Sequence, residues 1–217
     1  MGQVRIDKMK RPPEISISRL AIYLRFLEDY IKEKGPRSTI NSRELAHFLD
    51  INHHQIRKDL SYFGKFGERG IGYRTVELKE KINNILGLGR EWNLCLCGMG
   101  NLGSALLAYQ GFRLMRLNII AIFDSDEKKI GKTFQGIKVY SPESITQVAK
   151  RLNIDIAIIA VPHMAAQKIS DKLMRVGIRA ILNFAPVKLS VLPSVKLRNV
   201  DLATELINLS YFLSSLK

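Results

Sequence analysis

The 217-residue sequence contains only two cysteines, Cys95 and Cys97, which lie in an apolar run with one residue between them. Alternate residues of a β-strand point to the same face, and we expect no disulfide between such close neighbours. Metal binding would require further ligands at suitable spacing, and the surrounding sequence supplies none. We therefore predict that both thiols pack in a core, that the chain has no metal site, and that it works in a reducing compartment.

Long hydrophobic runs are also missing. No stretch approaches the roughly 20 apolar residues that span a membrane, and the opening MGQVRIDKMKRPPE lacks the apolar segment of a signal peptide. We therefore expect no membrane segment and a cytoplasmic location. Acidic residues are few, 20 against 34 basic ones, which gives a net charge of +14. This excess favours polyanionic partners such as nucleic acid or an anionic membrane surface, and general solubility is the simpler alternative.

The first part of the chain has helical periodicity. Apolar residues recur at helical spacing over residues 16–34, and a glycine-proline pair ends the pattern. A second helix is predicted to begin near Asn41, which with Glu44 resembles a capping box, and a third covers residues 53–63. The glycine-punctuated GKFGERGIGY then predicts a β-hairpin. This order is that of a winged helix-turn-helix, which we place at residues 1–80.

The third predicted helix has two different faces. Turning by about 100° per residue puts Ile56, Leu60 and Phe63 on one side. The other side and the hairpin carry basic and hydrogen-bonding residues suited to guanine edges and phosphates. We predict that the following residues bind DNA: His54, Arg57, Lys58, Ser61, Tyr62, Lys65, Arg69 and Arg74. A solvated charged face is the alternative that the sequence leaves open.

Beyond a glycine linker the pattern changes to short apolar strands that alternate with helices. The strands are predicted at residues 93–97, 118–124, 138–140, 155–161 and 180–184. This alternation predicts an α/β domain with a Rossmann-like, doubly wound parallel sheet and right-handed crossovers. We assign residues 81–200 to it.

The first predicted strand leads into CGMGNLG, residues 97–103, whose glycines have the spacing G-x-G-x-x-G and open a helix. In this context Gly98 permits a tight turn, Gly100 lets the backbone approach a pyrophosphate, and Gly103 lets the helix pack closely. We therefore predict an NAD(H) site at this turn, which also includes Met99, Asn101 and Leu102.

The second predicted strand ends at Asp124, about 20 residues after the glycines. A carboxylate there accepts hydrogen bonds from ribose hydroxyls and repels a 2′-phosphate, so the sequence favours NAD(H) over NADP(H). The nearby Lys128 and Lys129 weaken that preference, and a loop-capping aspartate is the alternative. Later strand ends add further predicted cofactor residues: Val161, Pro162, Asn183, Phe184, Ala185 and Pro186.

His163 follows the fourth predicted strand and could act as a proton-transfer base, although a surface or helix-capping histidine is the commoner case. No carboxylate partner for it stands out, so we assign it no role and predict no catalytic residue. The α/β half leaves no room for a separate substrate domain. We therefore interpret the dinucleotide as a signal that controls the DNA-binding half. The rival interpretation is an NAD-dependent oxidoreductase with an accessory DNA-binding domain.

Several sequence blocks together cover nearly the whole chain: RLAIYLRFLEDY, QIRKDLSYFGKFGERGIGY, CGMGNLGSALLAY, GIRAILNFAP and VDLATEL. These blocks resemble the Rex family of bacterial redox-sensing transcriptional repressors. The resemblance implies a homodimer that binds a two-fold symmetric operator when NAD⁺ prevails and releases it when NADH binds. It also implies an arginine, a tyrosine and an aspartate that exchange partners between redox states, which by motif are Arg25, Tyr109 and Asp201.

The C-terminal segment, residues 201–217, is predicted to be a helix with a leucine stripe. The leucines step by four and three: Leu202, Leu206, Leu209, Leu213 and Leu216. So large an apolar face at the end of a chain predicts a dimerisation helix, and packing on the chain's own sheet is the alternative. The resemblance implies that the helix inserts between the partner's cofactor and DNA-binding domains.

Overall fold

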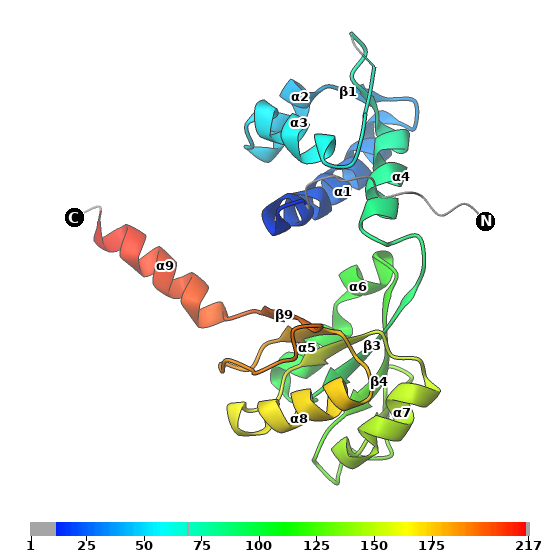
Figure 1. Ribbon diagram of the computed structural model, residues 1–217, viewed down its shortest axis with the longest axis vertical. Helices are drawn as coiled ribbons and strands as arrows, with labels where there is room; N and C mark the ends of the chain where they lie inside the picture. Colours follow the sequence, from blue (N-terminus) through cyan, green and yellow to red (C-terminus); the bar gives the residue numbers. More distant parts are fainter. Residues whose placement is uncertain (1–11, 69, 216–217) are drawn as a thin grey trace. The chain divides into compact units, whose positions relative to one another are not determined.

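The computed structural model describes residues 12–68 and 70–215 and divides the chain into two compact units. Unit 1 ends at Arg90, and unit 2 begins at Glu91 (Figure 1). The domain boundary predicted at residue 80 lies inside a helix of unit 1, Thr75–Ile85. That helix belongs to unit 1 because its apolar residues Leu78 and Ile82 are buried in the core of that unit.

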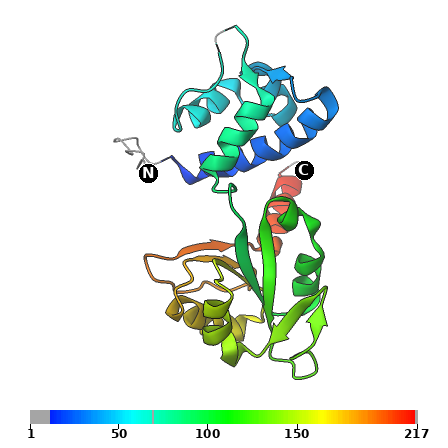
Figure 2. The same cartoon turned by 90° about the vertical axis from the view of Figure 1, so that its right-hand side faces the viewer.

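Unit 1 is helical, with a small two-stranded sheet. Its elements are α1 (Glu14–Lys34), β1 (Thr39–Ile40), α2 (Ser42–Leu49), α3 (His53–Ser61), β2 (Tyr73–Arg74) and α4 (Thr75–Ile85). The helices α1 and α4 lie side by side (Figures 1 and 2), and α3 packs against both α1 and α2. The predicted order of helices and hairpin is confirmed, and the N-terminal unit has the fold class expected of a winged helix-turn-helix.

Local signals in the sequence explain where these helices begin and end. At α2, Asn41 Oδ1 accepts a hydrogen bond from the Glu44 N–H at 3.0 Å, and Glu44 Oε2 accepts one from the Asn41 N–H at 2.8 Å. This is the predicted capping box, which satisfies two of the backbone donors that a helix start leaves free. The helix α1 ends at Gly35, where φ is 87°, a value that glycine adopts without strain.

The wing, residues 64–68 and 70–74, follows α3. Glu68 and Gly72 form an antiparallel bridge, and β2 then pairs with β1, with Tyr73 opposite Ile40. A Cβ at Gly67 would lie 2.4 Å from the carbonyl oxygen of Gly72, so this close approach of two backbones requires glycine. The predicted hairpin is therefore a short, tight loop whose return strand is held by β1.

Unit 2 is an α/β domain. Its strands are β3 (Trp92–Cys97), β4 (Leu117–Phe123), β5 (Thr133–Phe134), β6 (Ile137–Tyr140), β7 (Ile156–Ile159), β8 (Ala180–Asn183) and β9 (Lys196–Asn199). They form one sheet with the order β5-β6-β4-β3-β7-β8-β9, in which only the β5-β6 pair is antiparallel. The predicted Rossmann-like parallel sheet is confirmed.

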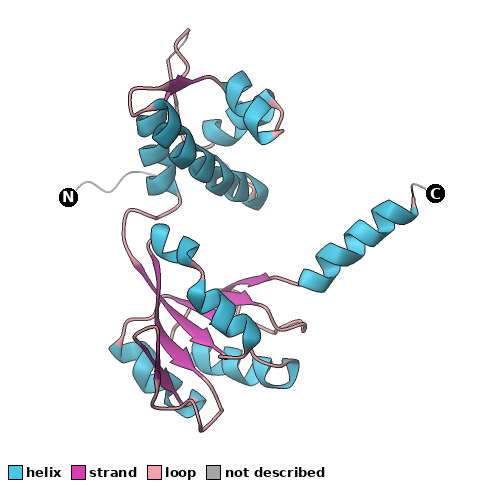
Figure 3. Ribbon diagram, turned by 180° about the vertical axis from the view of Figure 1, so that it is seen from behind, coloured by secondary structure: helices cyan, strands magenta, loops and turns pink. Residues whose placement is uncertain are grey.

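Helices cover both faces of this sheet (Figure 3). One apolar core joins the sheet to α7 (Ile145–Arg151) and α8 (His163–Arg175), and the other joins it to α5 (Asn101–Ala108) and α6 (Gln110–Leu114). Cys95 and Cys97 are fully buried in the first core and form no disulfide, as predicted. A hydrogen bond with Cys95 and burial raise the pKa of the Cys97 thiol.

Two strands lie outside the sequence prediction, and each has a physical reason. The short β5 is joined to β6 by Gln135 and Gly136, both with positive φ, which is the backbone of a tight hairpin turn. The edge strand β9 has the sequence KLRN, and its mostly exposed residues give none of the apolar signal that marks a buried strand.

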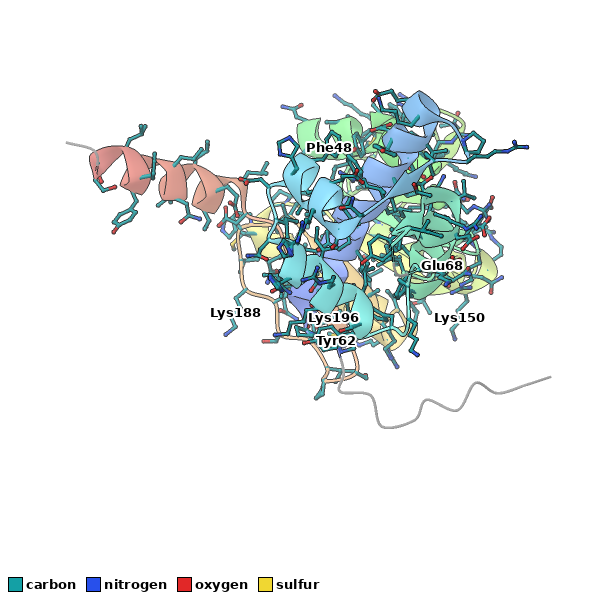
Figure 4. All side chains as sticks on the ribbon, turned by 90° about the horizontal axis from the view of Figure 1, so that it is seen from above. Phe48, Tyr62, Glu68, Lys150, Lys188 and Lys196 are labelled. Atoms are coloured by element: carbon teal, nitrogen blue, oxygen red, sulfur yellow. The ribbon has the colours of Figure 1, made fainter. Side chains whose placement is uncertain are left out.

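The final helix α9 (Leu202–Ser214) is exposed along its whole described length (Figure 4). Its large apolar side chains are between 58% and 75% exposed: Leu202, Leu206, Ile207, Leu209, Tyr211, Phe212 and Leu213. They do not pack on the sheet of their own unit, which was the alternative for this helix. Leu216 lies outside the described residues. Within the described ranges, no helix combines the length and the apolarity that a membrane span requires.

Candidate dinucleotide site and nucleic-acid interface

The glycine-rich turn joins β3 to α5 at the carboxyl edge of the sheet. Gly98 has a φ of 97°, and a Cβ there would lie 2.4 Å from the carbonyl oxygen of Ala160. A Cβ on Gly103 would lie 2.0 Å from the carbonyl oxygen of Gly98. Both positions therefore require glycine. Gly100 differs, because no atom lies within 4 Å of its Cβ position and a ligand can approach the backbone there.

The start of α5 presents unpaired backbone amides to this turn. Gly100 is the N-cap residue and has no side chain to accept a hydrogen bond from the first turn. The N–H groups and the helix dipole therefore concentrate positive potential at this end of α5. Gly100, Asn101 and Leu102 are exposed, while Met99 is buried beneath them. This arrangement suits an anion such as a pyrophosphate.

Asp124 follows β4 and lies beside the turn. Its Oδ2 accepts a hydrogen bond from the Met99 N–H at 2.6 Å, and its Oδ1 accepts one from the Asp126 N–H at 2.8 Å. The loop-capping alternative for Asp124 is therefore realised in this structure. It does not compete with ribose binding, because each carboxylate oxygen can accept two hydrogen bonds. The carboxylate both fixes the turn and keeps acceptor capacity.

Of the two lysines near Asp124 in the sequence, Lys129 is the one that contacts it. Its Nζ lies 3.8 Å from Asp124 Oδ2 and 3.5 Å from Asp126 Oδ2. The same ammonium group donates to the carbonyl oxygen of Met99 at 3.0 Å. A positive charge thus stands next to the carboxylate that is predicted to exclude a 2′-phosphate, held in place by the carboxylate itself.

The loops after β7 and β8 meet the glycine turn at the same sheet edge. The Ala160 N–H donates to the carbonyl oxygen of Cys97 at 2.7 Å, which brings Val161 and Pro162 beside the turn. The Phe184 N–H donates to the carbonyl oxygen of Ile159 at 2.8 Å. Val161 and Phe184 are half-buried and Pro162 is exposed. The predicted cofactor residues from three separate strands therefore line one edge.

Asn183 has a different position from its neighbours. Its side chain is fully buried, and its Nδ2 donates to the carbonyl oxygens of Ala185 and Val187, each at 3.1 Å, and to Asn199 Oδ1 at 2.9 Å. Its Oδ1 accepts from the Ala185 N–H at 3.0 Å. The amide is thus used internally to shape the loop, and its burial keeps it from the exposed edge in this structure. Pro186, at the end of that loop, is exposed.

A cavity of about 370 Å³ lies at the same sheet edge, between the loops after β4 and β6 and the first turns of α8. Sequence reasoning missed its residues, which include Ser125, Ile130, Ser141, Pro142, Ala165 and Ile169. Ser125, Ser141 and Pro142 follow closely on strand ends, and Ala165 and Ile169 lie on α8, so the sequence held a signal for these five. Ile130 lies in the middle of the loop between β4 and β5 and gave none. Glu127, Glu143, Lys168 and Lys172 also line the cavity, so it is only partly apolar. It lies beside Ser125, the residue after Asp124, and its apolar residues Ile130 and Ile169 suit an aromatic ring.

A larger cavity of about 470 Å³ lies elsewhere in unit 2. It is lined by residues where β3 and β4 begin, such as Asn93 and Leu117, and by Tyr109 and Phe112. Parallel strands place their amino ends at the edge opposite to their carboxyl ends, so this cavity is remote from the glycine turn. In sheets of this kind ligands bind at the carboxyl edge, and the smaller cavity is the better cofactor candidate.

The exposed face of α3 carries the predicted DNA-binding residues. His54, Arg57, Lys58 and Ser61 are exposed, whereas Ile56 and Leu60 are buried as predicted. Arg57 lies within 2.9 Å of His54 Nδ1 through Nη2 and donates to Ser42 Oγ at 3.4 Å. Burial and the nearby His54 and Arg57 lower the pKa of His53. Short contacts within the face thus pre-order the arginine that would reach DNA.

The wing presents fewer unpaired basic side chains than its sequence predicts. Arg74 is shared by two carboxylates, Glu68 at 4.0 Å and Glu77 at 3.7 Å. Lys65 is exposed, and Tyr62 at the end of α3 is half-buried. Arg69 lies outside the described residues.

Sequence reasoning missed one group on α3, the buried Asp59. It accepts hydrogen bonds from Ser16, Arg19 and Tyr23 of α1 and from Gln55 of α3. Burial by itself raises the pKa of Asp59, but these hydrogen bonds outweigh it and hold the pKa below the ordinary value. The signal was the spacing of the three α1 residues by three and four, which puts them on one helix face.

The structure gives each predicted switch residue a distinct setting. Arg25 is exposed on α1. Tyr109, between α5 and α6, is 49% exposed and packs edge-on against Phe112, so it is not a core residue. Asp201 is exposed and caps α9 by accepting from the N–H groups of Ala203 and Thr204. Hydrogen bonds from the Thr204 side chain and from these amides lower the pKa of Asp201.

His163 begins α8 and is exposed. Among residues 12–68 and 70–215 no group of three or more histidine, cysteine or acidic side chains could hold a metal ion. The site that remains is an anion-binding turn with a carboxylate beside it. Such a site can bind a dinucleotide, and the described residues offer it no paired acid and base.

Two family models match the chain. Residues 89–187 match the model described as a CoA binding domain, and residues 13–61 match the model described as a putative DNA-binding protein N-terminus. The first match spans the glycine turn, Asp124 and the NFAP loop. The second spans α1, α2 and α3.

Curated relatives are similar over nearly their full length. The redox-sensing transcriptional repressor Rex of Desulfitobacterium hafniense (strain DSM 10664 / DCB-2) is 49% identical over 199 residues, which cover 92% of this chain and 94% of the relative. The redox-sensing transcriptional repressor Rex of Roseiflexus sp. (strain RS-1) is 42% identical over 209 residues, which cover 96% of this chain and 94% of the relative.

Two solved structures are similar in fold as well as in sequence. The crystal structure of RSP in complex with beta-NAD+ and operator DNA has a TM-score of 0.88 and 38% identity, and the match covers 94% of this chain and 93% of that one. The crystal structure of RSP in complex with beta-NADH has a TM-score of 0.82 and 35% identity, and it covers 98% and 96%. RSP is described as a Rex-family repressor.

Proposed function

Because the chain belongs to the Rex family of redox-sensing transcriptional repressors, we propose that α3 and the wing read its operator while the glycine turn holds NAD(H). The chain is a non-enzymatic regulator that binds operator DNA and NAD⁺ or NADH. Because the members of this family are regulators and not enzymes, the rival interpretation of the chain as an oxidoreductase is excluded. The observation that carries the proposal is the presence in one chain of an open anion-binding turn at Gly100 and an exposed basic face on α3.

The cofactor is proposed to lie along the carboxyl edge of the sheet. Its pyrophosphate would meet the backbone at Gly100 and the first amides of α5. The adenosine ribose would donate to Asp124, and the adenine would enter the cavity next to Ser125. The nicotinamide would then lie toward Phe184 and Pro186, whose loop is shaped by the buried Asn183 amide. Bound there, the nicotinamide supplies the redox state that the protein senses.

The function is tested by measuring operator binding at a fixed total dinucleotide concentration while the NADH fraction is varied. Fluorescence anisotropy of a labelled operator should show full binding in NAD⁺ alone and release as the NADH fraction rises. The same titration with NADPH should release little DNA. An operator complex that is indifferent to the NADH fraction would refute the sensing role.

Asp124→Ala is expected to relax discrimination against NADPH. The substitution removes the proposed ribose acceptor and the charge that repels a 2′-phosphate, and it leaves the Lys129 ammonium with Asp126 as its remaining carboxylate partner. Because Asp124 also binds the Met99 N–H, NADH affinity alone is a poor readout. The ratio of the NADPH and NADH dissociation constants, measured by calorimetric titration, should fall by about tenfold or more, since a charged hydrogen bond is worth about 1.5–3 kcal/mol.

Asp126→Ala is the matched control for that variant. It also removes a carboxylate from Lys129, but Asp126 is more exposed and accepts only from Lys128 N–H in its own loop. The control should keep the wild-type ratio. If Asp124→Ala keeps it too, the ribose lies elsewhere.

The chain is proposed to act as a homodimer on a two-fold symmetric operator. The apolar residues of α9 would be buried against a second copy of the chain, and Glu205 is the only charged residue between Leu202 and Ser214. Burying one such side chain stabilises a protein by about 1.5–3 kcal/mol. A helix that stays exposed in water gains none of this free energy, whereas a dimer gains it from the apolar residues of both copies.

Leu206→Lys and Leu209→Lys are each expected to weaken the dimer strongly, because a charge would enter the proposed interface. Asn208→Lys adds the same charge about 100–160° around α9 from the leucines, outside the leucine stripe, and should weaken the dimer far less. Sedimentation velocity across a dilution series measures the dimer dissociation constant of all three. Leucine variants as dimeric as the Asn208 control would show that this stripe is not the interface.

Asp201 is proposed to carry the switch by pairing with Arg25 in one redox state and with Tyr109 in the other. Its role as N-cap is compatible with this, because Oδ1 accepts from the backbone amides while Oδ2 accepts only from the Thr204 hydroxyl and can accept one further hydrogen bond. Asp201→Asn separates the two, since asparagine caps a helix as well as aspartate does. We expect an unchanged melting temperature and an altered ratio of NADH dissociation constants with and without operator, a coupling that is typically about 1–3 kcal/mol.

A different result is expected if Asp201 only caps α9. A pure cap predicts that Asp201→Asn behaves as wild type in both measurements, whereas Asp201→Ala loses about 1 kcal/mol of stability. An Asn variant that keeps the full wild-type coupling ratio would remove Asp201 from the switch.

A further inference from the structure

Asp59 is the one charged residue of the described chain that is fully buried. It lies on α3 immediately after Arg57 and Lys58 but points to the opposite side of the helix, into unit 1. Ionised carboxylates are almost never buried without compensating partners, because their desolvation is costly. A buried aspartate on the helix that is proposed to read DNA therefore requires an explanation beyond packing.

The carboxylate is completely satisfied by side chains. Its Oδ1 accepts from Ser16 Oγ at 2.8 Å, from Arg19 Nη2 at 2.7 Å and from Gln55 Nε2 at 2.8 Å. Its Oδ2 accepts from Tyr23 Oη at 2.7 Å and from Arg19 Nε. Arg19 therefore grips both oxygens with its fork, the geometry that gives an arginine-carboxylate pair its directional strength.

These bonds join two helices at one point. Ser16, Arg19 and Tyr23 form a stripe on α1, and Gln55 and Asp59 are one turn apart on α3. The two helices also pack against each other, and each contributes buried apolar residues to the core of unit 1, such as Leu20 on α1 and Ile56 on α3. Apolar packing has no directional preference and tolerates small rotations of one helix on another. A bidentate ion pair with three further donors does not, because its angles are fixed.

The rotational setting of α3 decides where its outward side chains point. Side chains extend to a radius of about 6 Å from a helix axis, so a rotation of about 20° displaces their groups by about 2 Å. A bidentate hydrogen bond to a base edge does not survive such a displacement, whereas a phosphate contact adapts through a flexible side chain. Rotation would therefore cost specific binding more than non-specific binding.

We propose that Asp59 is a positioning residue, which through Arg19 and Tyr23 sets the orientation of α3 on α1 and thereby the operator specificity of the protein. The inference rests on the proposed role of α3 as the DNA reader. Asp59 itself touches no DNA. Its contribution is to the ratio of specific to non-specific affinity, because the charges of Arg57 and Lys58 remain in place whatever the orientation of the helix.

The test uses the full-length chain with Asp59→Asn, which keeps the side-chain shape but removes the charge that holds the Arg19 fork. Arg19→Lys is a second variant, which keeps the ion pair and loses only the fork. Ile82→Ala, in the core of the same unit on α4, is the control for destabilisation alone. Each variant is titrated with operator and with a scrambled duplex of equal length, well below its melting temperature and at several salt concentrations.

We expect Asp59→Asn to lower the ratio of operator to scrambled-duplex affinity by about tenfold or more, the discrimination carried by one to two base contacts. Affinity for the scrambled duplex, the salt slope and the NADH dissociation constant should change by less than about twofold, because the phosphate contacts and unit 2 are untouched. Arg19→Lys should show a smaller loss in the same direction. Ile82→Ala should keep the wild-type ratio despite its lower melting temperature.

An unchanged ratio in Asp59→Asn, or an equal loss in Ile82→Ala, overturns the proposal. If Asp59→Asn does not fold, the ratio measured for Arg19→Lys decides in the same way. Arg57→Ala, measured alongside, distinguishes the proposed DNA-reading role of α3 from the positioning role of Asp59. If it retains operator affinity, α3 is not the reader and both inferences fall; if it loses affinity while Asp59→Asn keeps its ratio, only the positioning role falls.

Discussion

Gly103→Ala is expected to unfold unit 2 under conditions where the wild type is stable, and NADH binding is lost with it. The added Cβ would lie 2.0 Å from the carbonyl oxygen of Gly98. Gly98 has little room to move away, because its own Cβ position lies 2.4 Å from the carbonyl oxygen of Ala160. To relieve that clash, α5 must move away from β3 and loosen the apolar core between them. We expect this to lower the free energy of unfolding by about 3 kcal/mol or more. For a unit of this size we expect a fall in melting temperature of about 10 °C.

The fluorescence of Trp92 measures this effect directly, because it is the only tryptophan of the chain and lies on β3 in unit 2. Gly100→Ala is the matched control, since no atom lies within 4 Å of its Cβ position. That variant should melt like the wild type but bind NADH about tenfold or more weakly, because a methyl group enters the space needed by the pyrophosphate. Equal melting temperatures for Gly103→Ala and the wild type would contradict the packing argument.

Arg57→Ala is expected to have the largest effect on operator binding. A dimer on a two-fold operator loses the contact twice, and each specific arginine contact is worth about 1–3 kcal/mol, so affinity should fall by about thirtyfold at least. Lys58→Ala should weaken operator and scrambled DNA alike and flatten the salt dependence by about one unit of slope per monomer. Both should bind NADH as the wild type does, because unit 2 is unchanged.

Lys32→Ala on α1 controls for the lost charge. Lys32 is 76% exposed and is paired with Asp29, and it belongs to the same unit without lying on α3. The control should bind operator within about twofold of wild type, as expected for an exposed ion pair. An Arg57 variant no weaker than this control would place the DNA-reading surface elsewhere.

The sequence predicted those features that depend on local chemistry. The capping box of Asn41 and Glu44 marks the start of α2 without reference to the rest of the fold. The glycine spacing, read together with the strand before it, predicted the turn that the geometry of Gly98 and Gly103 requires. Helical periodicity likewise separated the buried Ile56 from the exposed Arg57.

Features that depend on distant contacts were not predicted. Asp59 is buried because Arg19 and Tyr23, about forty residues earlier, meet it across the helix interface. The domain boundary was placed too early to include α4, whose burial against α1 is a tertiary property. The cavity of about 370 Å³ arises where the loops after β4 and β6 meet α8. The strand β9 is held by backbone pairing with β8 and by the hydrogen bond from Asn183 to Asn199, both of which are tertiary contacts. The periodicity of apolar residues in a sequence carries no information about which distant segments come into contact.

We expect NADH and operator DNA to weaken each other's binding to the protein. The most direct measurement is the NADH dissociation constant of the wild-type protein, determined with and without saturating operator. Linkage requires that a ligand which releases DNA must itself bind more weakly when DNA is present. We expect a dissociation constant that is about 5- to 150-fold higher with operator, the range of typical allosteric coupling. Identical constants in the two titrations would contradict it.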